Sequence, residues 1–180
     1  MRSSGFVRAH VAFGANLGDP FAAFARAMAA LAAMPDTRPV ARSSYYRSAP
    51  LGVAGRQPNY VNAVVALDTG LAPQALLDAL LAIEAAEGRT RDAPLAPRPI
   101  DLDLLLHGET VLRTPALTLP HPRLHRRAFV LLPLAEIAPD LVIPGIGALA
   151  PLLETVRNQC IVRLEDAHTP VRGLAEPAMA

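Results

Sequence analysis

The feature that most constrains this chain is a proline-bracketed arginine that leads directly into a short apolar run carrying two aspartates. Residues 96–106 read Ala-Pro-Arg-Pro-Ile-Asp-Leu-Asp-Leu-Leu-Leu. Because side chains alternate faces along a strand, Asp101 and Asp103 are predicted to share one face, about 6.5–7 Å apart. Neighbouring carboxylates repel unless a cation lies between them, and such oxygen ligands suit Mg²⁺. On spacing alone, a solvated acidic edge strand is an equally good interpretation.

Composition limits the classes of protein that this chain can belong to. Its 180 residues are 52% apolar with a net charge of +1, which predicts one folded domain over 1–180 and argues against a broad nucleic-acid surface. The single Cys160 excludes an internal disulfide and is expected to be at least partly buried. The alanine-rich segment 21–34 is too short to cross a bilayer, and no targeting segment is apparent. We expect a cytoplasmic monomer without membrane or nucleic-acid partners.

Apolar periodicity and turn residues divide the chain into alternating strands and helices. The order strand–helix–strand–strand–helix–strand predicts an α+β fold with a ferredoxin-like βαββαβ core and an antiparallel sheet. His107 is interpreted as a loop residue, and residues 1–8 and 165–180 are expected to be flexible. The expected strands are 10–13, 38–47, 60–67, 100–106, 114–119 and 141–143, and the expected helices are 20–33, 73–87, 129–137 and 149–156.

An aromatic ring and an amide are predicted to lie side by side on the strand that begins at Tyr60. Alternation places Tyr60 and Asn62 on the same face, at one end of that strand. A ring that stacks and an amide that forms hydrogen bonds are what a flat heterocycle requires. Without further context, an aromatic core residue beside a satisfied amide is the better interpretation.

Basic residues gather in two segments on either side of the paired aspartates, although the net charge is near zero. Carboxylates that hold Mg²⁺ and arginines that bind phosphate oxygens are the usual components of phosphoryl transfer. Neither a P-loop nor a protein-kinase signature is present. Asn16, in the Gly14–Gly18 turn, is expected to support a neighbouring loop. The basic residues are Arg89, Arg91, Arg98, His121, Arg126 and Arg127.

Taken together, these motifs resemble those of the 6-hydroxymethyl-7,8-dihydropterin pyrophosphokinase family of folate biosynthesis. The resemblance runs in order from about residue 9 to 157, which is the expected catalytic core. Its most specific block is Pro97-Arg98-Pro99-Ile100-Asp101-Leu102-Asp103. The other matching segments are 14–18, 44–52, 58–63, Glu84 with 88–91, 119–122 and 127–129.

The resemblance implies transfer of the diphosphate of ATP to the hydroxymethyl oxygen of the pterin, with release of AMP. It implies that Asp101 and Asp103 bind two Mg²⁺ ions. Catalysis is expected to come from alignment and electrostatics, since no base is obvious. The implied catalytic residues are Arg89, Arg98, His121 and Arg127. The implied pterin-binding residues are Ser48, Ala49, Leu51, Tyr60, Asn62 and Phe129. The implied nucleotide-binding residues are Arg89, Arg91, Arg98, Leu104, Thr118, His121 and Arg127.

Three positions depart from the family pattern. Leu95 stands where some members have tryptophan, Pro122 where some have tyrosine, and Ala116 where an arginine is usual. The length and composition of loops 48–58 and 89–98 predict that both move and close on substrate. Two alternatives stay open: another Mg²⁺-dependent nucleotidyl- or phosphotransferase acting on a heterocyclic alcohol, and a non-catalytic pterin- or nucleotide-binding module.

Overall fold

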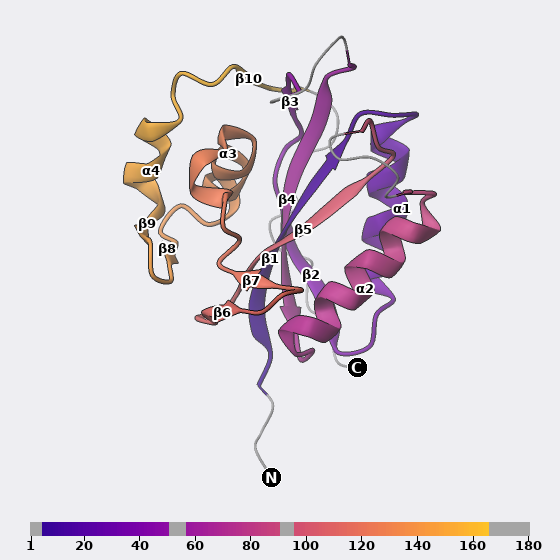
Figure 1. The fold of residues 1–180 in the computed structure, drawn as a ribbon, viewed down its shortest axis with the longest axis vertical. Helices are drawn as coiled ribbons and strands as arrows, with labels where there is room; N and C mark the ends of the chain where they lie inside the picture. The colour runs from indigo at the N-terminus through magenta and orange to yellow at the C-terminus, as the bar shows by residue number, and fades with distance from the viewer. Residues whose placement is uncertain (1–4, 51–56, 91–95, 166–180) are drawn as a thin grey trace, which may run out of the picture.

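Strand β1 (Val7–Ala15) lies inside an antiparallel sheet, between β4 (Tyr60–Thr69) and β5 (Asp101–His107) (Figure 1). The computed structural model describes residues 5–50, 57–90 and 96–165. The far edge of β4 pairs with two shorter strands, β2 (Thr37–Arg42) and β3 (Tyr46–Ser48), and β3 pairs in turn with β10 (Ile161–Arg163). The predicted α+β class with an antiparallel sheet is confirmed.

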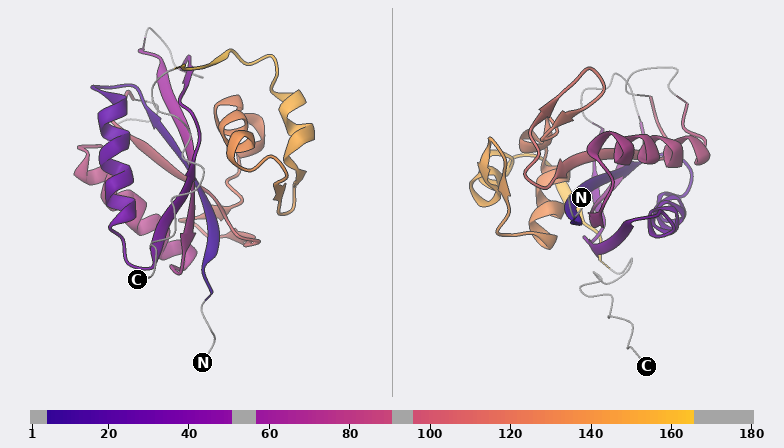
Figure 2. Two further views of the ribbon diagram at one scale, coloured as in Figure 1. Left: turned by 180° about the vertical axis from the view of Figure 1, so that it is seen from behind. Right: turned by 90° about the horizontal axis from the view of Figure 1, so that it is seen from below.

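Helices cover both faces of this sheet. Helices α1 (Pro20–Ala32) and α2 (Pro73–Ala86) lie on one face, and α3 (Ala128–Ile137) and α4 (Leu149–Thr155) lie on the other (Figure 2). Helix α1 begins where Asp19 Oδ1 accepts hydrogen bonds from the backbone N–H groups of Phe21 and Ala22, at 3.0 and 3.1 Å. All four helices confirm predictions from apolar periodicity, with bounds shifted by at most one residue.

Alternation along the central strands separates two hydrophobic clusters. On β1, Val11 and Phe13 belong to the first cluster, which faces α1 and α2, whereas Ala12 belongs to the second cluster, which lies beneath α3 and α4. Val64 of β4 likewise faces α3, and its neighbours Ala63 and Val65 face the opposite way. The α3 side of the sheet is covered by helix at one end only, so polar side chains on that face meet a cavity at the other end.

Short elements connect β5 to α3 and α3 to α4. After β5 the chain forms a small hairpin, passes through a 3₁₀ turn and enters α3, carrying several predicted site residues with it. A second small hairpin then leads into α4. These elements are β6 (Leu112–Arg113), β7 (Thr118–Leu119), the 3₁₀ turn η1 (Leu124–Arg126), β8 (Val142–Ile143) and β9 (Gly147–Ala148).

The predicted strand 38–47 is wrong in one respect, because two serines divide it into β2 and β3. Ser43 Oγ accepts a hydrogen bond from the Val64 N–H at 2.9 Å, and Ser44 turns toward α3. Ser44 Oγ and Tyr46 OH both donate to the Glu136 carboxylate of α3, at 2.8 Å each. The polar side chains therefore interrupt the strand and attach it to the helix above.

Two further predictions from the sequence are corrected, and one strand is added. His107 is not a loop residue: it ends β5, is buried, and its Nε2 lies 2.9 Å from the Leu71 carbonyl oxygen. Cys160 is exposed rather than buried, because it lies just before the edge strand β10. That strand was not predicted. Within the part of the chain that the structure describes, no helix has the length and apolarity needed to cross a bilayer.

Candidate active site

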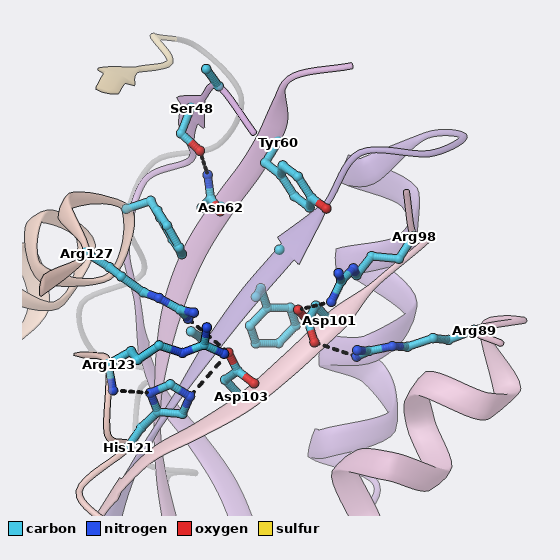
Figure 3. Close-up of a pocket in the computed structure, with 15 residues that line it drawn as sticks. Ser48, Tyr60, Asn62, Arg89, Arg98, Asp101, Asp103, His121, Arg123 and Arg127 are labelled. Carbon is cyan, nitrogen blue, oxygen red and sulfur yellow. Dashed lines mark hydrogen bonds and ion pairs between the residues drawn. The ribbon is translucent and has the colours of Figure 1, made fainter. Parts of the chain in front are cut away.

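A cavity of about 290 Å³ opens on the α3 side of the sheet, beyond the end of the second hydrophobic cluster (Figure 3). Its floor comes from β1, β4 and β5, and its walls come from β3, from the segment before β5 and from the segment that enters α3. The predicted site residues that line it are Ser48, Ala49, Tyr60, Asn62, Arg89, Arg98, Asp101, Asp103, His121, Arg127 and Phe129. Leu51 and Arg91 lie outside the described residues.

Strand register explains how residues from distant parts of the sequence meet on this floor. Gly14 of β1 is directly opposite Asn62 on one side and opposite Asp101 on the other. Two residues earlier in β1, Ala12 is opposite Asp103. A Cβ atom at position 14 would lie 3.6 Å from Asn62 Oδ1 and 3.9 Å from Asp101 Cβ. The absence of a side chain at Gly14 therefore keeps the floor open between the amide and the carboxylate.

One end of the cavity combines two aromatic residues with a buried amide. Asn62 Nδ2 donates to Ser48 Oγ at 2.9 Å and to the Tyr46 carbonyl oxygen at 3.2 Å. Tyr60 and Phe129 line the same end, and both are half-buried. This arrangement presents ring faces and an oriented amide to a flat, polar-edged ligand. Asn62 is satisfied by its neighbours, as the simpler interpretation expected, and it also lines the cavity.

At the other end of the cavity, Asp101 accepts hydrogen bonds from two arginines. Arg98 Nη1 donates to Asp101 Oδ2 at 2.8 Å, and Arg89 Nη1 donates to Asp101 Oδ1 and also to Glu84. Glu84, on the last turns of α2, is buried and accepts the Leu102 N–H at 2.7 Å. Burial disfavours the charge on Arg89, but Asp101 and Glu84 outweigh it and raise the pKa of that guanidinium.

Asn16 fixes the loop that carries Arg98. Its Oδ1 accepts the Arg98 N–H at 2.9 Å, and its own N–H donates to the Arg98 carbonyl oxygen at 3.1 Å. Its Nδ2 donates to the Pro58 carbonyl oxygen at 3.2 Å. Asn16 therefore ties the turn after β1 to the chain segments before β4 and β5, as the sequence predicted for this residue.

Asp103 faces cations at longer range. Its Oδ2 lies 3.8 Å from His121 Nε2 and 3.7 Å from Arg127 Nη1 (Figure 3). Burial and the neighbouring Asp101 carboxylate raise the pKa of Asp103 above its ordinary value. Burial lowers the pKa of His121, and burial together with Arg123 lowers that of Arg127. Burial and Asp101 therefore oppose the negative charge of Asp103, whereas His121 and Arg127 favour it.

One of the basic residues predicted to lie at the site is turned away from the cavity, and a different arginine lines it. Arg126 lies on the exposed side of η1, where its Nε donates to His125, and Arg123 lines the cavity instead (Figure 3). Arg123 and Arg127 are the residues that cap the two ends of the 3₁₀ turn, and both line the cavity. The density of charge in this segment does not distinguish Arg123 from Arg126, so the sequence pattern does not predict which of them lines the cavity.

A second pocket, of about 310 Å³, adjoins the first on the other side of the aspartates. Arg89, Asp101, Asp103 and His121 line both pockets, so the paired carboxylates lie at their junction. The predicted nucleotide-binding residues Leu104 and Thr118 line only the second pocket, together with Ala116 and Pro122. Leu104 is largely buried in the first hydrophobic cluster.

The donor chemistry at this junction fits a hard divalent cation. A carboxylate offers about four lone-pair sites, so Asp101 retains acceptor capacity after binding two arginines. Among the described residues, no group of three or more His, Cys, Asp and Glu side chains forms a metal site. The two aspartates would supply part of a coordination shell that water and phosphate complete, which is the usual manner of Mg²⁺ binding.

Fold and site together define a small α+β protein whose paired pockets join at two carboxylates surrounded by arginines. A family model described as 7,8-dihydro-6-hydroxymethylpterin-pyrophosphokinase matches residues 10–139. The 2-amino-4-hydroxy-6-hydroxymethyldihydropteridine pyrophosphokinase of Pseudomonas aeruginosa is 49% identical over 160 residues, covering 89% of this chain and 98% of that protein. Its namesake in Haemophilus influenzae is 39% identical over 158 residues, covering 88% and 98%.

The chain therefore belongs to the 7,8-dihydro-6-hydroxymethylpterin-pyrophosphokinase family. Among solved structures, the HPPK-DHPS protein of Plasmodium falciparum matches with a TM-score of 0.67 at 12% identity. That match covers 85% of this chain and 46% of the other, so this chain spans less than half of the larger protein. At this identity the similarity supports the fold alone.

Proposed function

We propose that this chain transfers the diphosphate of ATP to the hydroxymethyl oxygen of 6-hydroxymethyl-7,8-dihydropterin and releases AMP. The observation that carries the proposal is the pair of adjoining pockets that share Asp101 and Asp103. One pocket offers rings and an amide, and the other offers room for a nucleotide. Membership of the pyrophosphokinase family supports the same assignment.

We assign the pterin to the end of the first pocket lined by Tyr60, Asn62 and Phe129. The rings would stack on the bicyclic heterocycle, and the Asn62 amide would form hydrogen bonds with its edge. Ser48 supports that role because its hydroxyl accepts from Asn62 Nδ2 and fixes the amide. Ala49 lines the same end, and the assignment of Leu51 rests on the family pattern.

We assign Asp101 and Asp103 to two Mg²⁺ ions that accompany ATP. When bound, the ions would neutralise triphosphate charge and polarise the attacked phosphorus. Arg89 and Arg98 would hold phosphate oxygens on one side of the carboxylates, and His121 and Arg127 on the other. The adenosine is assigned to the second pocket beside Leu104 and Thr118, and the assignment of Arg91 rests on the family pattern.

The chain's contribution to the reaction is then mainly alignment. Asn16 holds the backbone of Arg98, whose guanidinium donates to the Ala96 carbonyl oxygen and to Asp101. Glu84 holds the Arg89 guanidinium, so both cationic groups are fixed before the nucleotide arrives. Donors fixed in advance stabilise developing charge without reorganising during the reaction. His121 Nδ1 accepts the Arg123 N–H at 3.2 Å and burial lowers the pKa of the ring, so the neutral imidazole would donate one hydrogen bond, from Nε2.

The broader expectations also remain proposals. A ferredoxin-like core is supported by the order of β2, β4, β1 and β5 and by the position of α1 and α2 on one face. One catalytic domain, a monomeric state and a cytoplasmic location are proposed with it. The net charge of +1 supports small-molecule substrates rather than nucleic acid.

The decisive experiment measures AMP release from ATP with the pterin as acceptor. We compare the wild type with Asp103→Asn, which preserves side-chain size, and with Asp140→Asn, a matched control at an exposed aspartate. Asp103→Asn is expected to lower the rate by about 100-fold or more, because a carboxylate at the metal junction is lost. Asp140→Asn is expected to leave it unchanged. Formation of ADP or free pyrophosphate by the wild type would contradict the proposal.

A further inference from the structure

Gln159 lies between α4 and β10, outside the residues 10–139 that the family model matches. We infer that Gln159 is a positioning residue that fixes Arg127 and Phe129, and so sets the geometry of the phosphate and pterin ends of the site together. The hydrogen bonds of Gln159 are observed in the structure whatever the substrates are, whereas the identity of the two substrates rests on the proposed function above.

The Gln159 side chain bridges the backbone on both sides of Arg127. Its Nε2 donates to the Arg126 carbonyl oxygen at 2.8 Å, and its Oε1 accepts the Ala128 N–H at 2.9 Å. The N–H groups in the first turn of a helix have no partner within that helix. Arg127 is the N-cap of α3 and provides no side-chain cap, so Gln159 caps the helix from a distant part of the chain.

The clamped backbone carries one residue for each end of the cavity. Arg127 and Phe129 both line the cavity, and the Arg127 guanidinium lies 5.4 Å from the centre of the Phe129 ring. This distance is within the range of a cation–π interaction, which links the two side chains. A small rotation of the peptide at Ala128 would therefore displace both the arginine beside Asp103 and the ring at the opposite end.

Gln159 is itself held by the second hydrophobic cluster. Its N–H donates to the Val156 carbonyl oxygen at 2.9 Å. Val156 is buried in the same cluster as Ala128 and Leu131, as is Leu149 at the start of α4. The amide is thus attached to a packed helix rather than to a free loop. Its neighbour Asn158 is exposed and offers a matched control.

Steady-state kinetics of the full chain test the functional part of this inference. Gln159→Met preserves length but removes both hydrogen bonds, and we expect kcat/KM to fall about tenfold, with a rise in the KM for the pterin. Gln159→Glu keeps an acceptor for Ala128 and loses the donor to Arg126, so an intermediate loss of about threefold is expected. Asn158→Ala is expected to stay within about twofold of the wild type.

Two further measurements separate positioning from simple stabilisation and from failure of the proposed function. If Gln159→Met lowers the melting temperature but leaves kcat and both KM values unchanged at a temperature where it is folded, the inference is overturned. Hydrogen exchange of the Ala128 amide needs no substrate: it should accelerate in Gln159→Met and stay near wild type in Gln159→Glu. Unchanged exchange in Gln159→Met overturns the clamp, even if the wild type releases no AMP.

Discussion

Asn62 connects the packing of the sheet edge to the proposed recognition of a ligand. Its Nδ2 is committed to Ser48 and to the Tyr46 carbonyl oxygen, so its Oδ1 is directed along the floor toward Gly14. The side chain is buried, and a buried amide that loses its partners costs about 1–3 kcal/mol. One residue therefore both fastens β3 to β4 and presents an acceptor to the cavity.

Replacing Asn62 with Asp tests this double role. The new carboxylate has no N–H to donate and faces the Tyr46 carbonyl oxygen, which it repels. We expect the KM for the pterin to rise by about 10- to 100-fold, with little change in the KM for ATP. Kinetics with each substrate varied in turn provide the measurement. An equal rise in both KM values would show that Asn62 acts on the whole site rather than on the pterin end.

At the scale of elements, β1 governs the site because its neighbours on both sides carry functional residues. The register places Asn62, Gly14 and Asp101 in one row across β4, β1 and β5. Asp103 follows opposite Ala12. Small residues on the central strand thus separate two large functional groups on the strands beside it, and their size controls the depth of the cavity.

Substitution at Gly14 separates fold stability from cavity depth. The site lies in a regular strand, and a Cβ there makes only ordinary contacts, so Gly14→Ala is expected to stabilise the fold by about 0.5–1 kcal/mol. Gly14→Val also suits a strand, but its methyl groups project over Asn62 and Tyr60. Urea unfolding and pterin titration should show stability retained, with affinity falling a few-fold for Ala and at least about tenfold for Val. Full pterin affinity in Gly14→Val would refute a floor at Gly14.

At the scale of the whole molecule, local patterns predicted more than long-range pairing did. Strand alternation correctly placed Asp101 and Asp103 on one face and Ile100 and Leu102 in the core. It failed for β10 and for the division of 38–47, because edge pairing and the Ser44–Glu136 contact join residues far apart in sequence. Arg123 and the role of Gln159 depend on turn geometry and on a distant backbone, which charge density and periodicity do not encode.

Stability of the whole fold is expected to depend on His10, which is buried in β1. Burial, reinforced by Arg8, lowers the pKa of His10 from 6.5 to about 4. Above pH 6.5 the ring is neutral in both folded and unfolded chains and contributes no pH dependence. Between pH 6.5 and 4 only the unfolded chain binds the proton. The free energy of unfolding therefore decreases as the pH is lowered, by roughly 3 kcal/mol over the whole window.

His10→Leu removes this titration and provides the comparison. The free energy of unfolding in urea, measured at pH 7 and pH 5, should fall by about 2 kcal/mol more in the wild type than in the variant. The difference between the two proteins cancels the contributions of all other titrating groups that they share. Parallel pH profiles would mean that His10 binds a proton equally well in the folded and unfolded chains.

The row formed by Asn62, Gly14 and Asp101 also fixes the distance that a ligand must span to reach both ends of the site. Two strand spacings separate its ends, about 9.6 Å in total, and hydrogen bonds across an antiparallel sheet hold that length. A compound that joins a flat heterocycle to an anionic group would have to match this span, because the backbone does not stretch to accommodate a longer or shorter linker. The length of the linker, rather than the affinity of either end group alone, should therefore determine which of these linked inhibitors occupy both halves of the site.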